Sequence, residues 1–209
     1  MDQMTTIPTE GRNARRKERT RAALVRAAEQ LLVSGRAQDA SVKEITELAD
    51  VGFGSFFNHF ASKTELFDSA LTGAAGRYEE WLESKLTGVS DPFERLALSI
   101  RYTGRLHLTH PEEAQLLIGQ TTFLHAGKPP LADRVLADVV AAIAMLPNAG
   151  LGPSTALAAT GAIASVLAAA AVLPEVERAE LADSLVADVL RLLGVDGATI
   201  LELTSKPLD

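Results

Sequence analysis

The sequence contains no cysteine, and only 5% of its 209 residues are aromatic. Without cysteine, disulfides and thiolate metal sites are excluded, as is common for proteins of a reducing cytoplasm. The start of the chain, MDQMTTIPTEGRNARRKE, lacks the apolar region of a secretory signal peptide, so we expect a cytoplasmic protein. Hydrophobic residues make up 47% of the chain and charged residues 22%, which is ordinary for a soluble globular protein with a real core.

Sequence motifs of catalysis are also missing. There is no nucleophile elbow, no P-loop and no dinucleotide-binding loop. His107, His110 and His125 lack the tight spacing of metal ligands. We therefore expect no catalytic residue, no metal and no cofactor, and a protein that is not an enzyme.

Positive charge is scarce overall but concentrated near the start. The formal net charge is −7, which by itself disfavours a nucleic-acid partner. Residues 11–36, however, hold eight basic and two acidic residues, a balance of 8 − 2 = +6. Residues 71–209 hold 10 basic and 17 acidic residues. This asymmetry indicates that one end faces a polyanion, although a solvated basic tail is the alternative.

A long uncharged stretch runs from Val139 to Pro174 and is long enough to span a bilayer. It is rich in alanine, contains Thr155, Thr160 and Ser165, and has no flanking basic cluster. We therefore expect no membrane partner, and a helix packed closely between other helices.

Apolar spacing predicts an all-α protein throughout. Leu24, Ala27, Ala28, Leu31 and Leu32 follow the i, i+3, i+4, i+7 pattern of an amphipathic helix. We detect no convincing strand and no internal repeat. The helices are expected at 19–34, 42–49, 53–60, 63–86, 91–110, 111–120, 130–146, 154–173 and 175–193, with the last two closing the chain.

Residues 41–60 predict a helix-turn-helix. Ser41 and Glu44 form a capping box for a helix of about two turns, and a tight turn at 50–52 joins it to a second short helix. In VGFGSFFNHF, Phe56 and Phe60 lie on one face and are expected to pack inward. Phe53 and Phe57 form a second pair that is expected to be partly exposed.

The exposed half of this segment suits a DNA-reading helix. Gly52 permits close approach to the DNA backbone, Ser55 can reach a base edge and Phe53 can meet a thymine methyl group. Asn58, His59 and Lys63 can donate to phosphates. Singly, Phe53 could equally pack on the body and His59 could be an ordinary surface histidine. The combination favours DNA.

The segment SVKEITELADVGFGSFFNHFASKTELF resembles the DNA-binding segment of the tetracycline-repressor (TetR) family of bacterial transcriptional regulators. The matching residues are Ile45, Ala49, Val51, Gly54, Phe56, His59, Phe60, Ser62, Lys63 and Leu66. The resemblance covers about residues 17–70. Four positions depart from the family pattern: Thr46 stands for alanine, Asp50 for glycine in a turn where we expect a left-handed backbone, Gly52 for a capping serine, and Phe57 for a tyrosine that contacts phosphate.

The resemblance implies three parts: a flexible basic arm (1–16), a DNA-binding domain (17–70) and a helical ligand-binding and dimerisation domain (71–209). It implies a homodimer on double-stranded DNA with a near-palindromic operator. The expected function is sequence-specific transcriptional regulation, by a repressor that a small apolar or amphipathic effector releases. The DNA-binding residues expected are Ser41, Lys43, Gly52, Phe53, Ser55, Phe57, Asn58, His59 and Lys63.

The second domain carries no motif, so its sites are inferred from patterns. Polar residues on otherwise apolar helices are expected to line the effector site: Arg101, Tyr102, Arg105, Gln115, Gln120, Thr121 and His125. The last two helices are expected to form the dimer interface through Ala158, Ala162, Ser165, Ala169, Leu181, Leu185, Val189 and Leu192. Two alternatives remain: an all-α small-molecule carrier or enzyme with an incidental basic start, and a helical interaction adaptor.

Overall fold

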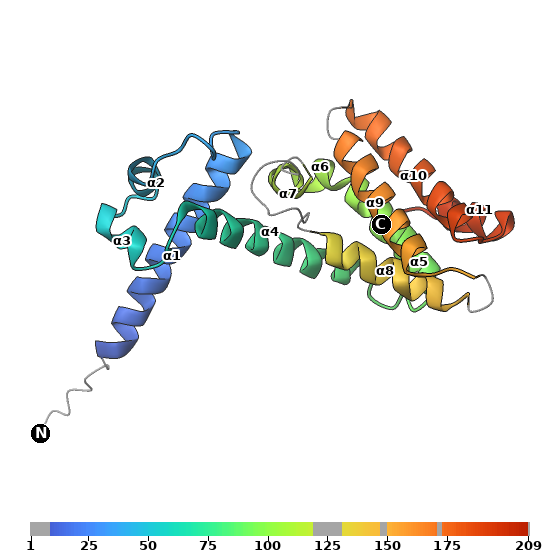
Figure 1. The fold of residues 1–209 in the computed structure, drawn as a ribbon, viewed down its shortest axis with the longest axis horizontal. Coiled ribbons are helices and arrows are strands. Elements are labelled where there is room, and N and C mark those ends of the chain that lie inside the picture. Colours follow the sequence, from blue (N-terminus) through green and yellow to red (C-terminus); the bar gives the residue numbers. More distant parts are fainter. Residues whose placement is uncertain (1–8, 119–130, 147–149, 171–172, 209) are drawn as a thin grey trace, which may run out of the picture. The chain divides into compact units, whose positions relative to one another are not determined.

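The computed structural model describes residues 9–118, 131–146, 150–170 and 173–208, and in these ranges it has helices and no strand (Figure 1). This confirms the all-α prediction. The helices are α1 (Thr9–Val33), α2 (Val42–Leu48), α3 (Phe53–Phe57), α4 (Lys63–Lys85), α5 (Pro92–Gly104), α6 (Leu106–Thr109), α7 (Pro111–Leu117), α8 (Ala132–Ala144), α9 (Pro153–Ala170), α10 (Glu175–Leu192) and α11 (Gly197–Ser205).

The chain divides into two compact units, Met1–Leu71 and Thr72–Asp209, and α4 contributes residues to both. In unit 1, the apolar stripe of α1 and the short helices α2 and α3 share one small core. Leu24, Leu31, Ile45 and Phe56 are all at most 1% exposed. Helices as short as α2 and α3 are marginal alone in water, so this shared core holds them in place.

Unit 2 is built around α5, which packs against α10 and α8, while α9 packs against α8 and α10. The core consists of aliphatic side chains from these four helices, with Leu96, Val139, Ile163 and Val186 at its centre. One apolar side of each of these helices packs into this core, as amphipathic periodicity predicts.

Helices α1, α3 and α5 differ most from the predicted bounds. Helix α1 begins at Thr9, ten residues before the expected start, so residues 9–16 are helical where the sequence analysis expected a flexible arm; residues 1–8 lie outside the described part. Arginine, lysine and glutamate are good helix formers, and an existing helix extends without new nucleation. Helix α3 ends at Phe57, and the expected helix 91–110 breaks at Arg105 into α5 and α6.

The sequence analysis missed α11. Asp196 caps this helix by accepting from the backbone N–H groups of Ala198 at 3.0 Å and Thr199 at 3.1 Å. Ile200 and Leu203 are buried against the core of unit 2. The helix therefore completes that core rather than trailing from it.

Helix α9 contains no charged residue, and by length and composition it could cross a membrane. Only 28% of this 18-residue segment is buried in the protomer. The expectation of a helix surrounded by others is therefore met on one side only. The other side carries Ser154, Ala158, Ala162, Ser165 and Ala169, all exposed.

Candidate DNA-binding surface and effector cavity

A helix cap and a tight turn, both predicted from the sequence, fix the local structure of the helix-turn-helix. The Ser41 hydroxyl accepts from the Glu44 N–H at 3.1 Å and caps α2. The Glu44 carboxylate pairs with Arg36 rather than completing the capping box. Asp50 adopts φ = +53°, which confirms the left-handed turn and explains why a residue that tolerates this region stands there. Gly52 precedes α3 without a side-chain cap.

The four phenylalanines divide as predicted. Phe56 and Phe60 are 0% and 2% exposed, whereas Phe53 and Phe57 are 56% and 58% exposed and contact each other edge to face at 5.8 Å. The first pair anchors α3 to unit 1. The second pair presents apolar surface to solvent, which is costly for a helix that meets only water.

The other predicted DNA-binding residues mostly gather around this exposed pair. Gly52 and Asn58 are exposed, and Ser55 and His59 are half-buried at the same short helix. Ser41 and Lys43 are exposed on and before α2, where Lys43 lies 3.8 Å from Glu47. Thr46, where the family pattern has alanine, is buried and donates to the Lys43 carbonyl at 2.9 Å. These residues form one surface of unit 1.

His59 lies close to the positive charges of α1. Partial burial lowers the pKa of His59 below its ordinary value, and the nearby charges of Lys17 and Arg21 lower it further. The imidazole is therefore neutral at neutral pH and can donate one N–H to a phosphate. Arg21 also stacks over the Phe60 ring at 5.1 Å and donates to Ser69 at 2.8 Å.

Lys63 is placed differently from the other predicted contacts. Its ammonium group donates to the Ala40 carbonyl at 2.6 Å and to the Gln38 carbonyl at 3.4 Å. It therefore ties the start of α4 to the segment that leads into α2. In this DNA-free structure Lys63 positions the helix-turn-helix.

We expect Lys63→Met to destabilise the protein even without DNA. The loss leaves two carbonyl groups without this donor and should cost roughly 1–2 kcal/mol. Lys43→Met is the matched control and should stay within about 0.5 kcal/mol. Thermal unfolding without DNA is the measurement. Equal stability of the two variants would leave Lys63 as a phosphate contact only.

The predicted effector residues are largely engaged elsewhere. Arg101 on α5 and Arg105, which directly follows α5, both bind Asp183 on α10, at 2.8 Å and 2.6 Å. Burial raises the pKa of Asp183, but hydrogen bonds from the two arginines outweigh it and leave this pKa below its ordinary value. Arg101 and Arg105 therefore do not line the cavities described below, and their role at an effector site stays a prediction. They fasten α5 to α10.

The remaining predicted effector residues do not converge either. Tyr102 is 8% exposed and packs edge to face on Trp81 at 5.7 Å. Gln115 is exposed on α7. Gln120, Thr121 and His125 lie outside the described residues.

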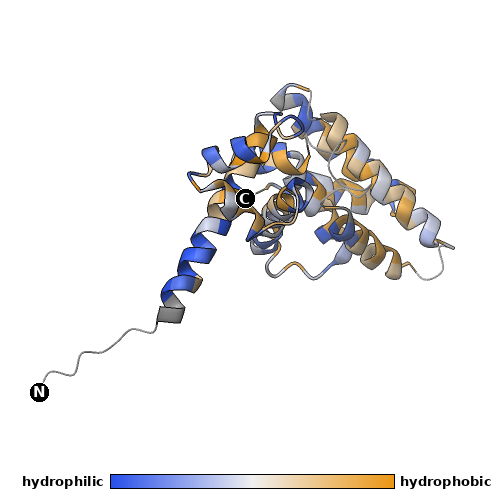
Figure 2. Cartoon of the chain, turned by 60° about the vertical axis from the view of Figure 1, so that its left-hand side comes forward, coloured by the Kyte–Doolittle hydropathy of each residue, from blue (hydrophilic) through white to orange (hydrophobic). Residues whose placement is uncertain are grey.

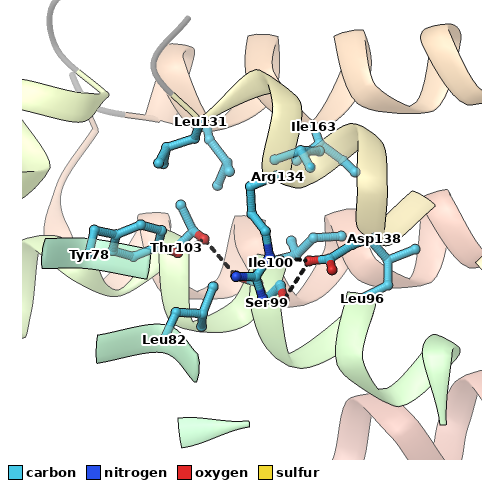
Figure 3. A pocket seen from close by; sticks show the side chains of 12 residues that line it. Tyr78, Leu82, Leu96, Ser99, Ile100, Thr103, Leu131, Arg134, Asp138 and Ile163 are labelled. Atoms are coloured by element: carbon cyan, nitrogen blue, oxygen red, sulfur yellow. Dashed lines mark hydrogen bonds and ion pairs between the residues drawn. The ribbon is translucent and has the colours of Figure 1, made fainter. Parts of the chain in front are cut away.

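A different set of residues lines a cavity inside unit 2, here termed the inner cavity (Figure 3). It lies between α4, α5, α8 and α9 and has a volume of about 20 Å³, which is room for little more than one water molecule. Its lining is Tyr78, Leu82, Leu96, Ser99, Ile100, Thr103, Leu131, Arg134, Val135, Asp138, Ile163 and Leu167. A ring-shaped ligand could enter only if some of these side chains moved.

Polar groups converge on one side of the inner cavity. Asp138 accepts from Ser99 at 2.9 Å and from Arg134 at 3.1 Å (Figure 3). Arg134 also reaches Glu83 on α4 at 2.8 Å. The Nη2 atom of Arg134 is buried without a hydrogen-bond partner. A buried donor of this kind costs free energy unless a ligand or water supplies an acceptor.

Tyr78 lies on the opposite side of the inner cavity and hydrogen-bonds to Thr103. Burial raises the pKa of Tyr78 to about 12, so its hydroxyl stays protonated. Tyr78 also lines a neighbouring outer cavity with Arg77, Trp81, Leu106, His110 and Glu113. Trp81 is the only tryptophan of the chain and can therefore report on both cavities by fluorescence.

Sequence reasoning missed the polar residues of the inner cavity. Arg134 and Asp138 stand four residues apart on α8, which looks like an ordinary surface ion pair. Nothing in the sequence around Ser99 indicated a functional role for this residue. Only the packing of α8 on α5 turns these three side chains toward one space.

The predicted dimer residues fall into two groups. Ala158, Ala162, Ser165 and Ala169 are exposed on α9, Leu192 is 49% exposed on α10, and Leu181 is half-buried. Leu185 and Val189 are 5% and 2% exposed and belong to the core of the protomer. Because α10 has apolar residues on more than one side, the core of the protomer takes these two, and the interface stays a prediction that rests on the exposed group.

Known proteins resemble this chain in two ways, by sequence within unit 1 and by structure over both units. Residues 24–70 match the family model for bacterial regulatory proteins of the tetR family. A comparison with curated proteins returned no match. Among solved structures, RolR in complex with resorcinol is 25% identical with a TM-score of 0.68, covering 94% of this chain and 98% of RolR.

Other similar structures share the fold. CprB of S. coelicolor A3(2), described as a TetR family protein, is 19% identical with a TM-score of 0.61, covering 90% of this chain and 99% of CprB. A gamma-butyrolactone receptor (ArpA-like protein) is 22% identical with a TM-score of 0.51, covering 81% of this chain and 97% of the receptor. With the helix-turn-helix of unit 1 and the helical unit 2, these matches indicate a DNA-binding transcriptional regulator with a TetR-like fold, in which residues 24–70 match the family model.

Proposed function

We propose that this regulator is a repressor that binds a near-palindromic duplex operator as a homodimer. We further propose that a small hydroxylated aromatic compound in the inner cavity releases it. The observation that carries the effector part is Arg134, whose buried Nη2 donor lacks a partner at a cavity with mainly apolar walls.

The DNA part is supported by the exposed surface of α2 and α3. Phe53 and Phe57 present apolar area suited to thymine methyl groups, and Ser55 lies between them. Gly52 leaves room for close approach of the DNA backbone. Asn58 and His59 follow at the end of α3 as phosphate donors. Lys63 supports this surface through its hydrogen bond to the Ala40 carbonyl.

The dimer part is supported by α9, whose exposed face is free of charge. A face of serine and alanine allows two helices to approach closely. A two-fold partner would cover it with the same face of a second copy, with Leu181 and Leu192 of α10 beside it. Such a dimer would space two α3 helices for half-sites about one helical turn, or ~10 base pairs, apart or a multiple of that.

The effector class is supported by the chemistry of the inner cavity. Leu82, Leu96, Ile100 and Ile163 supply apolar walls for a ring. The Arg134 Nη2 atom offers a donor, and the carboxylate of Asp138 offers an acceptor for a hydroxyl group. RolR, the similar protein, was solved with resorcinol, a ring of this kind.

A ligand at Arg134 would also act on α4. Arg134 donates to Glu83 on that helix, and Arg95 binds the same carboxylate at 2.9 Å. A hydroxyl that draws Arg134 toward the cavity would weaken its link to Glu83. Because α4 continues into unit 1, this link offers a route from the effector to the DNA-binding unit.

The test combines DNA binding with effector release. An operator fragment selected from genomic DNA is labelled, and its binding is followed by fluorescence anisotropy with resorcinol and other phenols, while Trp81 fluorescence reports ligand binding. We expect release of the wild type. In Arg134→Met the ligand concentration needed should rise by about 10–100-fold, the value of a hydrogen bond to a charged group.

Two further variants test whether the weaker response comes from the lost ligand contact. Arg134→Met leaves Asp138 unpaired in the interior, so the milder Ser99→Ala is measured in parallel. Arg191→Met, at an exposed arginine, is the matched control and should respond like the wild type. DNA binding that no phenol affects would overturn the effector class. Ligand binding without any salt-dependent DNA binding would instead favour the carrier alternative.

A further inference from the structure

The first turns of α1 form an exposed basic helix with no part of unit 1 against it. Every residue from Arg12 to Arg19 is exposed, on all sides of the helix (Figure 1). Figure 2 shows these turns as a continuous hydrophilic segment. Burial of α1 against its own unit is evident only from Leu24 onward. This part of α1 therefore contributes little to the core and is open to a partner.

The charge of this segment defines that partner. Residues 12–19 hold Arg12, Arg15, Arg16, Lys17 and Arg19 against the single acidic residue Glu18, a balance of 5 − 1 = +4. The rest of the chain is acidic overall, since the net charge is −7. Like charges at i, i+3 and i, i+4 repel along a helix, which disfavours it in isolation. A polyanion would remove this repulsion.

The same charges lie beside the end of the DNA-reading helix. Lys17 and Arg21 act electrostatically on His59, and Arg21 lies over the ring of Phe60. The basic helix is thus continuous with the surface formed by α3. Its first turns lead away from α3 rather than over it (Figure 1).

We propose that the N-terminal turns of α1, Thr9 to Arg19, are a second DNA-binding element, which contacts the duplex backbone outside the base pairs read by α3. This inference rests on the proposed function, because it presupposes that unit 1 binds DNA. In this proposal the arginines stand at fixed spacing on a helix and not on a flexible arm.

Helix length sets the reach of this element. Residues 9–19 span roughly 16 Å at 1.5 Å per residue. That length corresponds to about four or five base pairs of duplex. The contacts should therefore lie within about five base pairs beyond each half-site, and they should involve phosphates rather than base edges.

The experiment varies the length of the DNA. Two duplexes carry the same operator core, one ending at its half-sites and one extended by about eight random base pairs on each side. Wild-type protein should bind the extended duplex at least about tenfold more tightly. Arg12→Gln/Arg15→Gln/Arg16→Gln should bind both equally, because glutamine keeps helix propensity and removes the charge.

Salt dependence provides a second readout. Loss of three phosphate contacts should reduce the slope of log affinity against log salt by about 2.7 per protomer. Between about 50 and about 200 mM salt, the wild type should then lose roughly 40-fold more affinity per protomer than the triple variant. Arg191→Gln, at an exposed arginine of unit 2, is the control and should keep the wild-type slope.

Ala14→Pro separates a helix from a flexible arm. It keeps every charge but breaks the helix, and Ala14 is exposed, so no core contact changes. We expect it to lose the preference for extended DNA, and full retention would overturn the helical element. A wild type that binds both duplexes equally would refute the proposal while leaving DNA binding intact. A wild type that binds neither would refute the proposed function itself.

Discussion

Gly104→Ala should strongly destabilise unit 2. A Cβ atom at this position would lie 2.2 Å from the Cβ of Ala182, far inside van der Waals contact, and 3.7 Å from a methyl group of Leu167. Ala182 is 1% exposed on α10, so neither helix can yield without moving the other. We expect the free energy of unfolding to fall by about 1–3 kcal/mol.

A compensating substitution tests whether this contact is the cause. In Gly104→Ala/Ala182→Gly the methyl group changes sides, and most of the stability should return. Gly76→Ala on α4 is the control, since nothing lies within 4 Å of its added Cβ, and it should be neutral or gain up to about 1 kcal/mol. Thermal or denaturant unfolding is the measurement. A Gly104→Ala protein as stable as the wild type would show that α5 and α10 approach less closely.

The close approach also explains the ion pairs around it. Arg101 and Arg105 flank Gly104 in sequence, and both reach Asp183, which follows Ala182 on α10. The absent side chain at Gly104 brings the helices near enough for these contacts. Separation of the helices would leave a partly buried carboxylate without its arginines, which adds to the cost.

Ala162→Arg should abolish the dimer and with it most of the DNA affinity. Ala162 lies on the exposed, charge-free face of α9, where a two-fold axis would set two arginines against each other. A monomer binds only one half-site at a time, so the affinity for the full operator should fall by about 10²–10⁴-fold. Sedimentation velocity and anisotropy on the operator measure the two effects.

The control for this variant is Leu201→Arg, which places the same charge at a residue of α11 that is 69% exposed. It should remain dimeric and bind the operator normally. If Ala162→Arg also stayed dimeric with full affinity, the interface would lie elsewhere. A wild-type protein that is monomeric at micromolar concentration would refute the dimer altogether.

Much of unit 1 could be predicted from the sequence because its signals are local. The Ser41 cap, the left-handed turn at Asp50 and the two phenylalanine pairs all depend on residues within a few positions of each other. Such short-range constraints allow few alternatives. Lys63 is the exception, since its partners lie 23 and 25 residues earlier in the chain.

The extent of α1 was not predictable from composition. A polar, arginine-rich start reads as disorder when only core formation is considered. Propagation from the packed part of the helix costs far less than nucleation, so the helix continues to Thr9.

The sequence by itself determined that the chain is helical, that residues 41–60 form a helix-turn-helix and that Phe53 and Phe57 are exposed there. Tertiary structure alone decided which polar side chains of unit 2 pair with each other and which line its cavity. Arg101 looked like an effector contact until Asp183, 82 residues away, was placed against it. Arg134 and Asp138 looked like a surface pair until Ser99 was placed beside them. The physical reason is that helical periodicity shows which side of a helix is apolar, whereas only packing decides which neighbour covers it.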